Sequence, residues 1–178
     1  MYMVREMDAG DVIACHEEPI LPDDNAGALS ERLAARAADL LLTWLPTIAD
    51  GTAPRHPQDP AAVTFAPMIR KEERQIDWHD SAIDIWHQVR ALAPAPAATA
   101  QFRDLQVKIL AVHPVDPVPK MQEGKAGDLI ELAGQRGLFA ATGDGIIEIT
   151  SLQPAGKRLM SGMDFLRGYH ISTGDHFA

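Results

Sequence analysis

Residues 50–60 limit what this chain can fold into more than any other stretch of the sequence. They contain three prolines and one glycine and have little apolar content. Proline has no backbone N–H to donate and glycine weakens both helices and strands, so a loop is expected there. The sequence therefore predicts two structured parts, residues 1–50 and residues 80–178, joined by a linker over residues 51–79.

The first part is predicted to hold one strand and one helix. The segment 12–16 is short and mostly apolar, which predicts the strand. Apolar side chains recur at helical spacing over residues 27–45, and Pro46 is expected to end this helix. Its apolar face comprises Leu29, Leu33, Ala37, Leu40, Leu41 and Trp44. One strand and one helix cannot close a domain, so we expect a remnant of a larger α/β domain.

The second part is predicted to be a small antiparallel barrel with flanking helices. Asp80 or Ser81 can cap a helix that runs to Arg90, and Ser161 can cap a final short helix over residues 163–166. Five strand-like stretches lie between them, at residues 98–102, 107–112, 128–132, 138–141 and 146–152. Five short strands with little helix between them favour the oligonucleotide-binding (OB) type of barrel, which makes the chain α+β overall.

Charge and cysteine content exclude several classes of function. The net charge is −9, but residues 1–60 hold 4 basic and 11 acidic residues while residues 61–178 hold 12 and 14. Wholesale coating of nucleic acid is therefore not expected, although the second part can carry a local basic face. No apolar run approaches the ~20 residues of a membrane span. The single cysteine, Cys15, excludes an internal disulfide and is predicted to be a small core residue.

Two loops carry candidate functional side chains. Asp8 precedes a turn formed with Gly10 at the entrance of the predicted strand, so its carboxylate can point into a cleft. Lys157 and Arg158 lie in an extended loop between a strand and a helix, where paired cations can contact phosphate. The alternatives are an ordinary turn at Asp8 and a solvated loop at Lys157.

A metal site is the other chemistry considered. His79, Asp80, Asp84 and His87 are spaced so that one helix could present several ligands. The alternative is a helix cap followed by a solvated face. We predict no metal, because the pattern lacks the fixed residues of a known site.

Several motifs occur in the order found in one enzyme family. The stretch at residues 66–78, APMIRKEERQIDW, resembles the interdomain signature of methionyl-tRNA formyltransferases. Residues 7–11 resemble that family's L-D-T-G-D loop, and Asp59 with Phe65-Ala66 resembles its Q-D-x-x-x-x-T-Y-A stretch. The segments 142–145, 152–158, 160–161 and 164–168 are similar to its C-terminal domain. The resemblance is collinear over essentially the whole chain.

The resemblance implies a specific reaction and specific residues. The family transfers a formyl group from 10-formyltetrahydrofolate to the amino group of initiator methionyl-tRNA in cytoplasmic translation initiation. Asp8 matches the family's catalytic Asp, which orients and charge-pairs a histidine. Gly10 falls in the folate-site loop. Lys71, Arg74, Lys157 and Arg158 are the expected tRNA contacts, with no metal and no membrane partner.

Two departures from the family pattern limit these expectations. The Asn-x-His motif and the Ser-Leu-Leu-Pro folate segment, which belong upstream of residue 1, are absent, and Ala95 replaces an aromatic residue. We therefore expect a strand–helix remnant of a Rossmann-like formyltransferase domain plus the whole barrel, inactive in isolation, with a missing N-terminal half on another chain as a partner. The alternatives are a tRNA-binding or partner-docking module, or a sugar-nucleotide formyltransferase.

Overall fold

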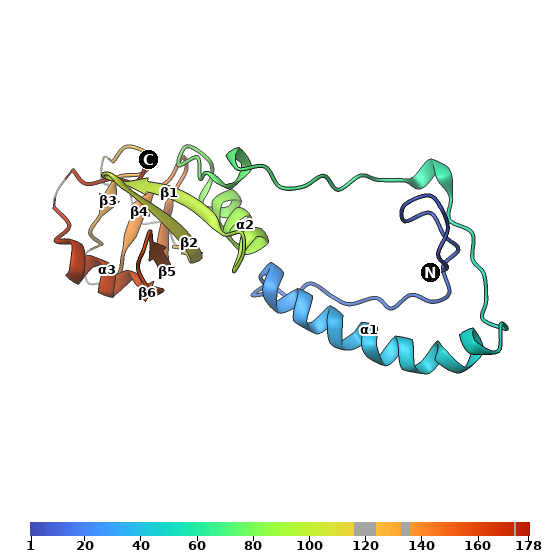
Figure 1. Cartoon of the computed structure of the whole chain (residues 1–178). Coiled ribbons are helices and arrows are strands. Elements are labelled where there is room, and N and C mark those ends of the chain that lie inside the picture. The colour runs from blue at the N-terminus through green and yellow to red at the C-terminus, as the bar shows by residue number, and fades with distance from the viewer. Residues whose placement is uncertain (116–123, 133–135, 173) are drawn as a thin grey trace. The chain divides into compact units, whose positions relative to one another are not determined.

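A computed structural model describes residues 1–115, 124–132, 136–172 and 174–178 and divides them into two compact units (Figure 1). The first unit comprises Met1–Asp24 and Ala28–Met68, and the second comprises Asn25–Gly27 and Ile69–Ala178. None of the helices in the described part of the chain combines the length and apolarity needed to cross a bilayer.

The first unit is dominated by helix α1, Ala26–Ala49. The expectation that Pro46 ends this helix is wrong, because Pro46 lies inside it. Proline removes one hydrogen bond but leaves its own carbonyl free to accept, and the Asp50 N–H donates to the Pro46 carbonyl at 3.0 Å. The helix ends at Ala49, and Gly51 just beyond it has a φ of 71°, the left-handed conformation that commonly terminates helices.

An ion-pair cluster holds the segment before α1 against the helix. Arg32 lies 2.6 Å from Glu18 and 2.6 Å from Asp24, and Arg36 lies 3.4 Å from the other oxygen of Glu18. The hydrogen bond from Arg32 lowers the pKa of Glu18. The last bridge to another segment before this cluster is that of Val12 with His56. The ion pairs, rather than a sheet, therefore hold residues 18–24 to the helix.

The strand predicted at residues 12–16 is wrong. Only Val12 pairs, in an isolated antiparallel bridge with His56, and Cys15 is exposed rather than in a core. A strand needs a neighbour along its length, and the described residues of this unit provide one only at His56. A 3₁₀ turn, Pro60–Ala62, follows, and the Asp59 side chain caps it by accepting the Ala61 N–H.

The second unit is a mixed α and β structure around a curled antiparallel sheet. After a 3₁₀ turn at Glu72–Arg74, its described elements are α2 (Ala82–Leu92), β1 (Ala98–Phe102), β2 (Leu105–Pro114), β3 (Leu129–Ile130), β4 (Phe139–Ala141), β5 (Ile146–Pro154), β6 (Met160–Ser161) and α3 (Gly162–Tyr169). The strand order is β1-β2-β5-β4-β3, with β6 paired to β5. The five predicted strands are present, and the two-residue β6 was not predicted.

The C-terminal segment connects the two edges of this sheet. Phe177 forms a bridge with Phe102 of β1, and His176 forms one with Asp128 just before β3. Arg103 binds Asp175 through two nitrogens, at 2.7 and 3.0 Å, and so fixes the start of the segment. The residues that line the core lie on one face of the curl, where Phe102, Phe165 and Phe177 are at most 1% exposed.

Helix α2 is attached to the sheet at its N-terminus. Ser81 caps it by accepting the Asp84 N–H at 3.0 Å, as one of the two predicted caps. Gly143 donates its N–H to the carbonyl of Asp80, and Asp144 accepts the Ala82 N–H at 3.0 Å. The turn at residues 142–145, which connects β4 to β5, is therefore hydrogen-bonded to the start of α2.

Candidate functional site

The loop that carries Asp8 is closed by contacts with residues 53–58 of the same unit. Tyr2 donates its N–H to Asp11 at 2.9 Å and its hydroxyl to the Ala53 carbonyl at 3.0 Å. The guanidinium of Arg55 lies 3.7 Å from the centre of the Tyr2 ring. The amide of Gln58 donates to the main-chain carbonyls of Asp8 and Gly10, both at 2.8 Å. The loop is thus fixed at several points although it contains no regular element.

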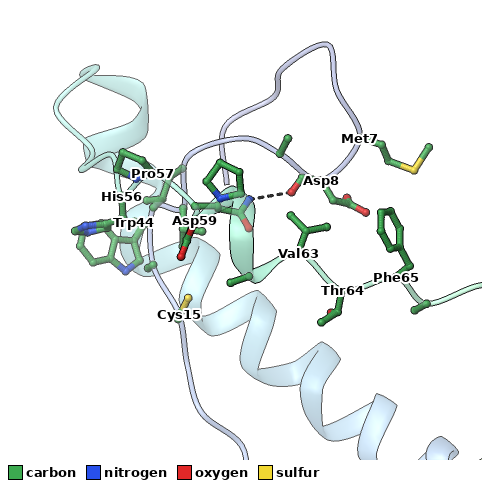
Figure 2. Close-up of a pocket in the computed structure, with 18 residues that line it drawn as sticks. Met7, Asp8, Cys15, Trp44, His56, Pro57, Asp59, Val63, Thr64 and Phe65 are labelled. Carbon is green, nitrogen blue, oxygen red and sulfur yellow. Dashed lines mark hydrogen bonds between the residues drawn. The ribbon is translucent and has the colours of Figure 1, made fainter.

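Asp8 lies at the exposed tip of this loop. Its φ of 55° is in the left-handed region, which Asp tolerates better than most residues. Because Gln58 binds the main chain of Asp8, the backbone is held while the carboxylate is left to other partners. Figure 2 shows Asp8 at the same end of a pocket as Met7 and Phe65, which are 91% and 90% exposed.

Gly10 has a structural reason to be glycine. It is buried, and a Cβ at this position would overlap the carbonyl oxygen of Tyr2. The close approach of the two chain segments, sealed by the bond from Tyr2 to Asp11, therefore depends on the missing side chain. This requirement is independent of any ligand.

The pocket beside Asp8 is a wide, open depression rather than an enclosed ligand site. Its volume is about 1160 Å³, above the about 1,000 Å³ at the upper end for typical ligand sites. Trp44 and His56 lie at the end opposite Phe65 (Figure 2). Val63 and Phe65 on its wall are 59% and 90% exposed. A surface this apolar and open is typical of an interface that another part of a protein covers.

The four predicted tRNA contacts all belong to the second unit but differ in what their side chains do. Lys71, Lys157 and Arg158 are exposed. Arg74 is half-buried and donates to the carbonyls of Ala97 and Pro96 at 3.2 and 3.1 Å. Guanidinium has five N–H groups, so Arg74 uses part of its capacity to fix its own segment.

The histidines and carboxylates considered as metal ligands are engaged differently. His79 donates its backbone N–H to Asp77 at 2.9 Å, which lowers the pKa of Asp77, and its ring lies 2.9 Å from the same oxygen. Asp84 accepts the Ser81 hydroxyl at 2.7 Å. Across the described ranges, no three His, Cys, Asp or Glu side chains are grouped so that they could hold a metal ion.

Sequence reasoning missed Gln58. Its neighbour Asp59 was noted for its resemblance to a family stretch, and Gln58 opens that stretch, so a signal existed. What no pattern showed is that its amide would reach back to Asp8 and Gly10. The bond joins two loops whose sequence separation is 50 residues.

Comparison with known sequences adds a family to this geometry. Residues 68–170 match the model described as "Formyl transferase, C-terminal domain". A methionyl-tRNA formyltransferase of Dictyoglomus turgidum is 42% identical over 99% of this chain and 56% of its own length. Those of Streptococcus gordonii and Lactococcus lactis subsp. lactis are 39% and 41% identical, again over 99% of the chain. The chain spans about 56% of the length of these relatives.

Comparison with solved structures supports the fold. HypX from Aquifex aeolicus, crystallised in complex with tetrahydrofolic acid, matches with a TM-score of 0.73 and 20% sequence identity over 96% of this chain and 29% of that one. A HypX variant with six substitutions matches with a TM-score of 0.72. At this identity the likeness concerns the fold alone.

Proposed function

Because the chain belongs to the formyl transferase family, whose C-terminal domain it carries, we propose that it is the C-terminal portion of a methionyl-tRNA formyltransferase. The observation that carries this proposal is the identity of about 40% to relatives of that name, extending over 99% of the chain. The complete enzyme would use 10-formyltetrahydrofolate as donor and initiator methionyl-tRNA as acceptor. It would act in the cytoplasm, at translation initiation.

Asp8 is proposed as the catalytic carboxylate of this chain. In the reaction, the amino group of methionine attacks the formyl carbon and a tetrahedral oxyanion forms. A carboxylate that accepts the Nδ1–H of a histidine orients the ring and stabilises its positive charge. Asp8 suits this role because it lies at the exposed tip of its loop and its backbone is held by the hydrogen bond from Gln58. The histidine would come from the rest of the enzyme, and Gly10 would shape the folate-side loop.

The finer architecture is part of the same proposal. Residues 1–50 would be a remnant of the Rossmann-like catalytic domain, residues 51–79 a linker, and residues 80–178 an OB-like barrel that binds tRNA. Support for a barrel comes from the bridges of Phe177 to β1 and of His176 to Asp128, which link the two edges of the sheet.

The open face of the first unit would be covered by the rest of the catalytic domain. The relatives are almost twice as long as this chain, so they contain polypeptide that could cover it. α1 buries none of its side chains, and Leu41, Leu42 and Leu45 are 56%, 69% and 49% exposed. The polypeptide that supplies the remaining length of the relatives is the partner that this face would bind.

The tRNA would be held by exposed cations of the second unit. Lys71, Lys157 and Arg158 are free to reach phosphates. Arg74 would hold the interdomain segment through Ala97 and Pro96 and would offer its remaining N–H groups to the tRNA. Contacts of this kind position the RNA without reading its sequence.

A formyl-transfer assay tests the proposal. The chain alone should give no turnover, and the chain mixed with the N-terminal part of the Dictyoglomus turgidum relative should formylate charged initiator tRNA. Asp8→Asn in the mixture should lower kcat/KM by about 10²–10⁴-fold, as expected for loss of a group that supports proton transfer. Asp11→Asn is the matched control, because Asp11 lies in the same loop and its carboxylate lies 3.4 Å from Arg55 at the surface.

Either of two results would contradict the proposal. One is full activity of the Asp8→Asn mixture, which would remove Asp8 from the chemistry. The other is transfer of the formyl group to a sugar nucleotide but not to methionyl-tRNA, which would change the acceptor.

A further inference from the structure

A small notch lies in the sheet of the second unit, between the first half of β2 and the end of β5. Its lining comprises Gln106, Lys108, Gln153, Pro154, Ala155 and Gly156, and its volume is about 150 Å³. In the ladder, Lys108 is directly opposite Gln153. At half the about 300 Å³ of a small ligand pocket, the notch suits a phosphate or a sugar-phosphate unit rather than a whole cofactor.

The register of the sheet places Lys108 on the solvent-exposed face of β2, where the notch lies. Along β2 the side chains alternate, with Val107 and Ile109 fully buried and Gln106 and Lys108 exposed. Lys108 also pairs with Thr99 of β1, so its backbone is held by strands on both sides. Among the described residues, no ion pair involves Lys108. Its ammonium group is thus presented from a rigid element and is not neutralised.

The loop that carries Lys157 and Arg158 is fastened to the rim of this notch. Ala155 donates its N–H to the Gln106 carbonyl at 2.9 Å, and Gln153 donates its side-chain amide to the Lys157 carbonyl at 2.9 Å. A tight turn is closed by the bond from the Lys157 N–H to the Pro154 carbonyl at 3.0 Å. The start of the cationic loop is therefore fixed beside Lys108.

Gly156 leaves the edge of the notch bare. Its φ of 72° is the conformation that glycine adopts without strain at the third position of such a turn. Among the residues that the structure describes, a Cβ there would meet no atom within 4 Å, so none of them fills the space beside it. A ligand can consequently approach the backbone closely at this point.

We propose that this notch binds one sugar-phosphate unit of RNA, with Lys108 donating to a phosphate oxygen and the Gln106 amide reaching the adjoining ribose hydroxyl. An ammonium group suits a phosphate, and an uncharged amide suits a 2′-hydroxyl, which both donates and accepts. The inference rests on the proposed function, since the ligand is the tRNA. It extends that surface from the loop of Lys157 and Arg158 onto the strands β2 and β5 (Figure 1).

Binding of labelled initiator tRNA to the full chain tests the notch, by fluorescence anisotropy over about 50–200 mM NaCl. Lys108→Ala should weaken binding about five-fold and reduce the slope of log K against log salt by about one, as for the loss of one phosphate contact. Lys108→Arg should retain the affinity. Lys125→Ala is the matched control, because Lys125 is an exposed lysine close to β3.

The outcomes separate the notch from the proposed function. If the wild-type chain binds tRNA and Lys108→Ala binds it with the same affinity and the same salt slope, the proposal for the notch is overturned and the proposed tRNA binding stands. If Lys125→Ala loses as much tRNA affinity as Lys108→Ala, the affinity depends only on overall charge. The proposal for the notch is then also overturned. If the wild-type chain does not bind tRNA at any salt concentration, the proposal for the notch and the proposal that the second unit binds tRNA are both overturned.

Discussion

The side-chain Nε2 of Gln58 lies 2.8 Å from the main-chain carbonyl oxygen of Asp8, and this hydrogen bond joins positions 50 residues apart. The same amide donates to Gly10 at 2.8 Å. Both bonds go to the backbone, so the loop is held without occupying the Asp8 carboxylate. Gln58 is therefore a positioning residue for Asp8.

Gln58→Ala should loosen the Asp8 loop without unfolding the chain. Two carbonyls lose their donor, and each such bond contributes about 0.5–1.5 kcal/mol. Hydrogen exchange should become faster at the Tyr2 and Val12 N–H groups, which bond to Asp11 and His56. Gln106→Ala, in the other unit, is the control and should leave these two exchange rates unchanged. Equal protection in Gln58→Ala and the wild type would contradict this role.

Gly143→Ala should destabilise the second unit. A Cβ at Gly143 would overlap the carbonyl oxygen of His79, and backbone there cannot rotate away. We expect a loss of about 1–3 kcal/mol in the free energy of unfolding, measured with urea. Gly168→Ala in α3 is the control: its Cβ would meet no atom of the described residues within 4 Å, so a gain of up to about 1 kcal/mol is expected. Equal stabilities of the two variants would refute the packing argument.

The contribution of Asp175 to stability should disappear in acid. The hydrogen bonds from Arg103 and from the Ser172 backbone lower the pKa of Asp175 in the folded chain. A carboxyl whose folded pKa is depressed stabilises the fold above its unfolded pKa of about 3.9, and this stabilisation is lost as the pH falls through the folded value. Asp175→Asn should therefore be less stable than the wild type at pH 7.

Thermal unfolding as a function of pH checks this expectation for Asp175. The gap in Tm between the wild type and Asp175→Asn should narrow only below about pH 4. Asp104→Asn, an exposed carboxylate in the β1–β2 turn, is the control and should show no such gap. A gap that is constant down to pH 2 would mean that the Asp175 charge is not responsible.

Reversing the charge of Lys157 and Arg158 together should weaken tRNA binding. Each lost phosphate contact should reduce the salt slope by roughly 0.7–0.9, so the double change to Glu should flatten it by about 1.4–1.8 units. The double reversal Lys125→Glu with Arg136→Glu is the control, because it changes the net charge equally at other exposed positions. Unchanged affinity and slope in Lys157→Glu/Arg158→Glu would make these residues an ordinary solvated loop.

Helix α1 should exchange its amide hydrogens rapidly in the isolated chain. It has no buried residues, and helices gain most of their stability from packing of an apolar face. Adding the N-terminal part of a relative should protect α1, while β2 and β5 should be protected throughout. Strong protection of α1 in the monomeric chain alone would show that its apolar face needs no partner.

Local sequence patterns were sufficient for much of the second unit. Ser81 and Ser161 cap α2 and α3 as predicted, because the capping bond links a side chain to a backbone N–H only three residues away. The five strands were also predictable, since alternation and turn residues are local. The interdomain motif and the C-terminal motifs also indicate the family, and the comparisons confirm it.

The sequence by itself thus determined the family, the order of most elements and the residues that could carry charge or chemistry. Tertiary structure alone decided that Pro46 lies within α1, that residues 12–16 lack strand partners, and that Cys15 is exposed. It also decided that the Gln58 amide binds the Asp8 carbonyl and that Lys108 pairs with Gln153 across the sheet. These facts depend on which segments meet in space, because hydrogen-bond partners and burial are supplied by residues far away in the chain.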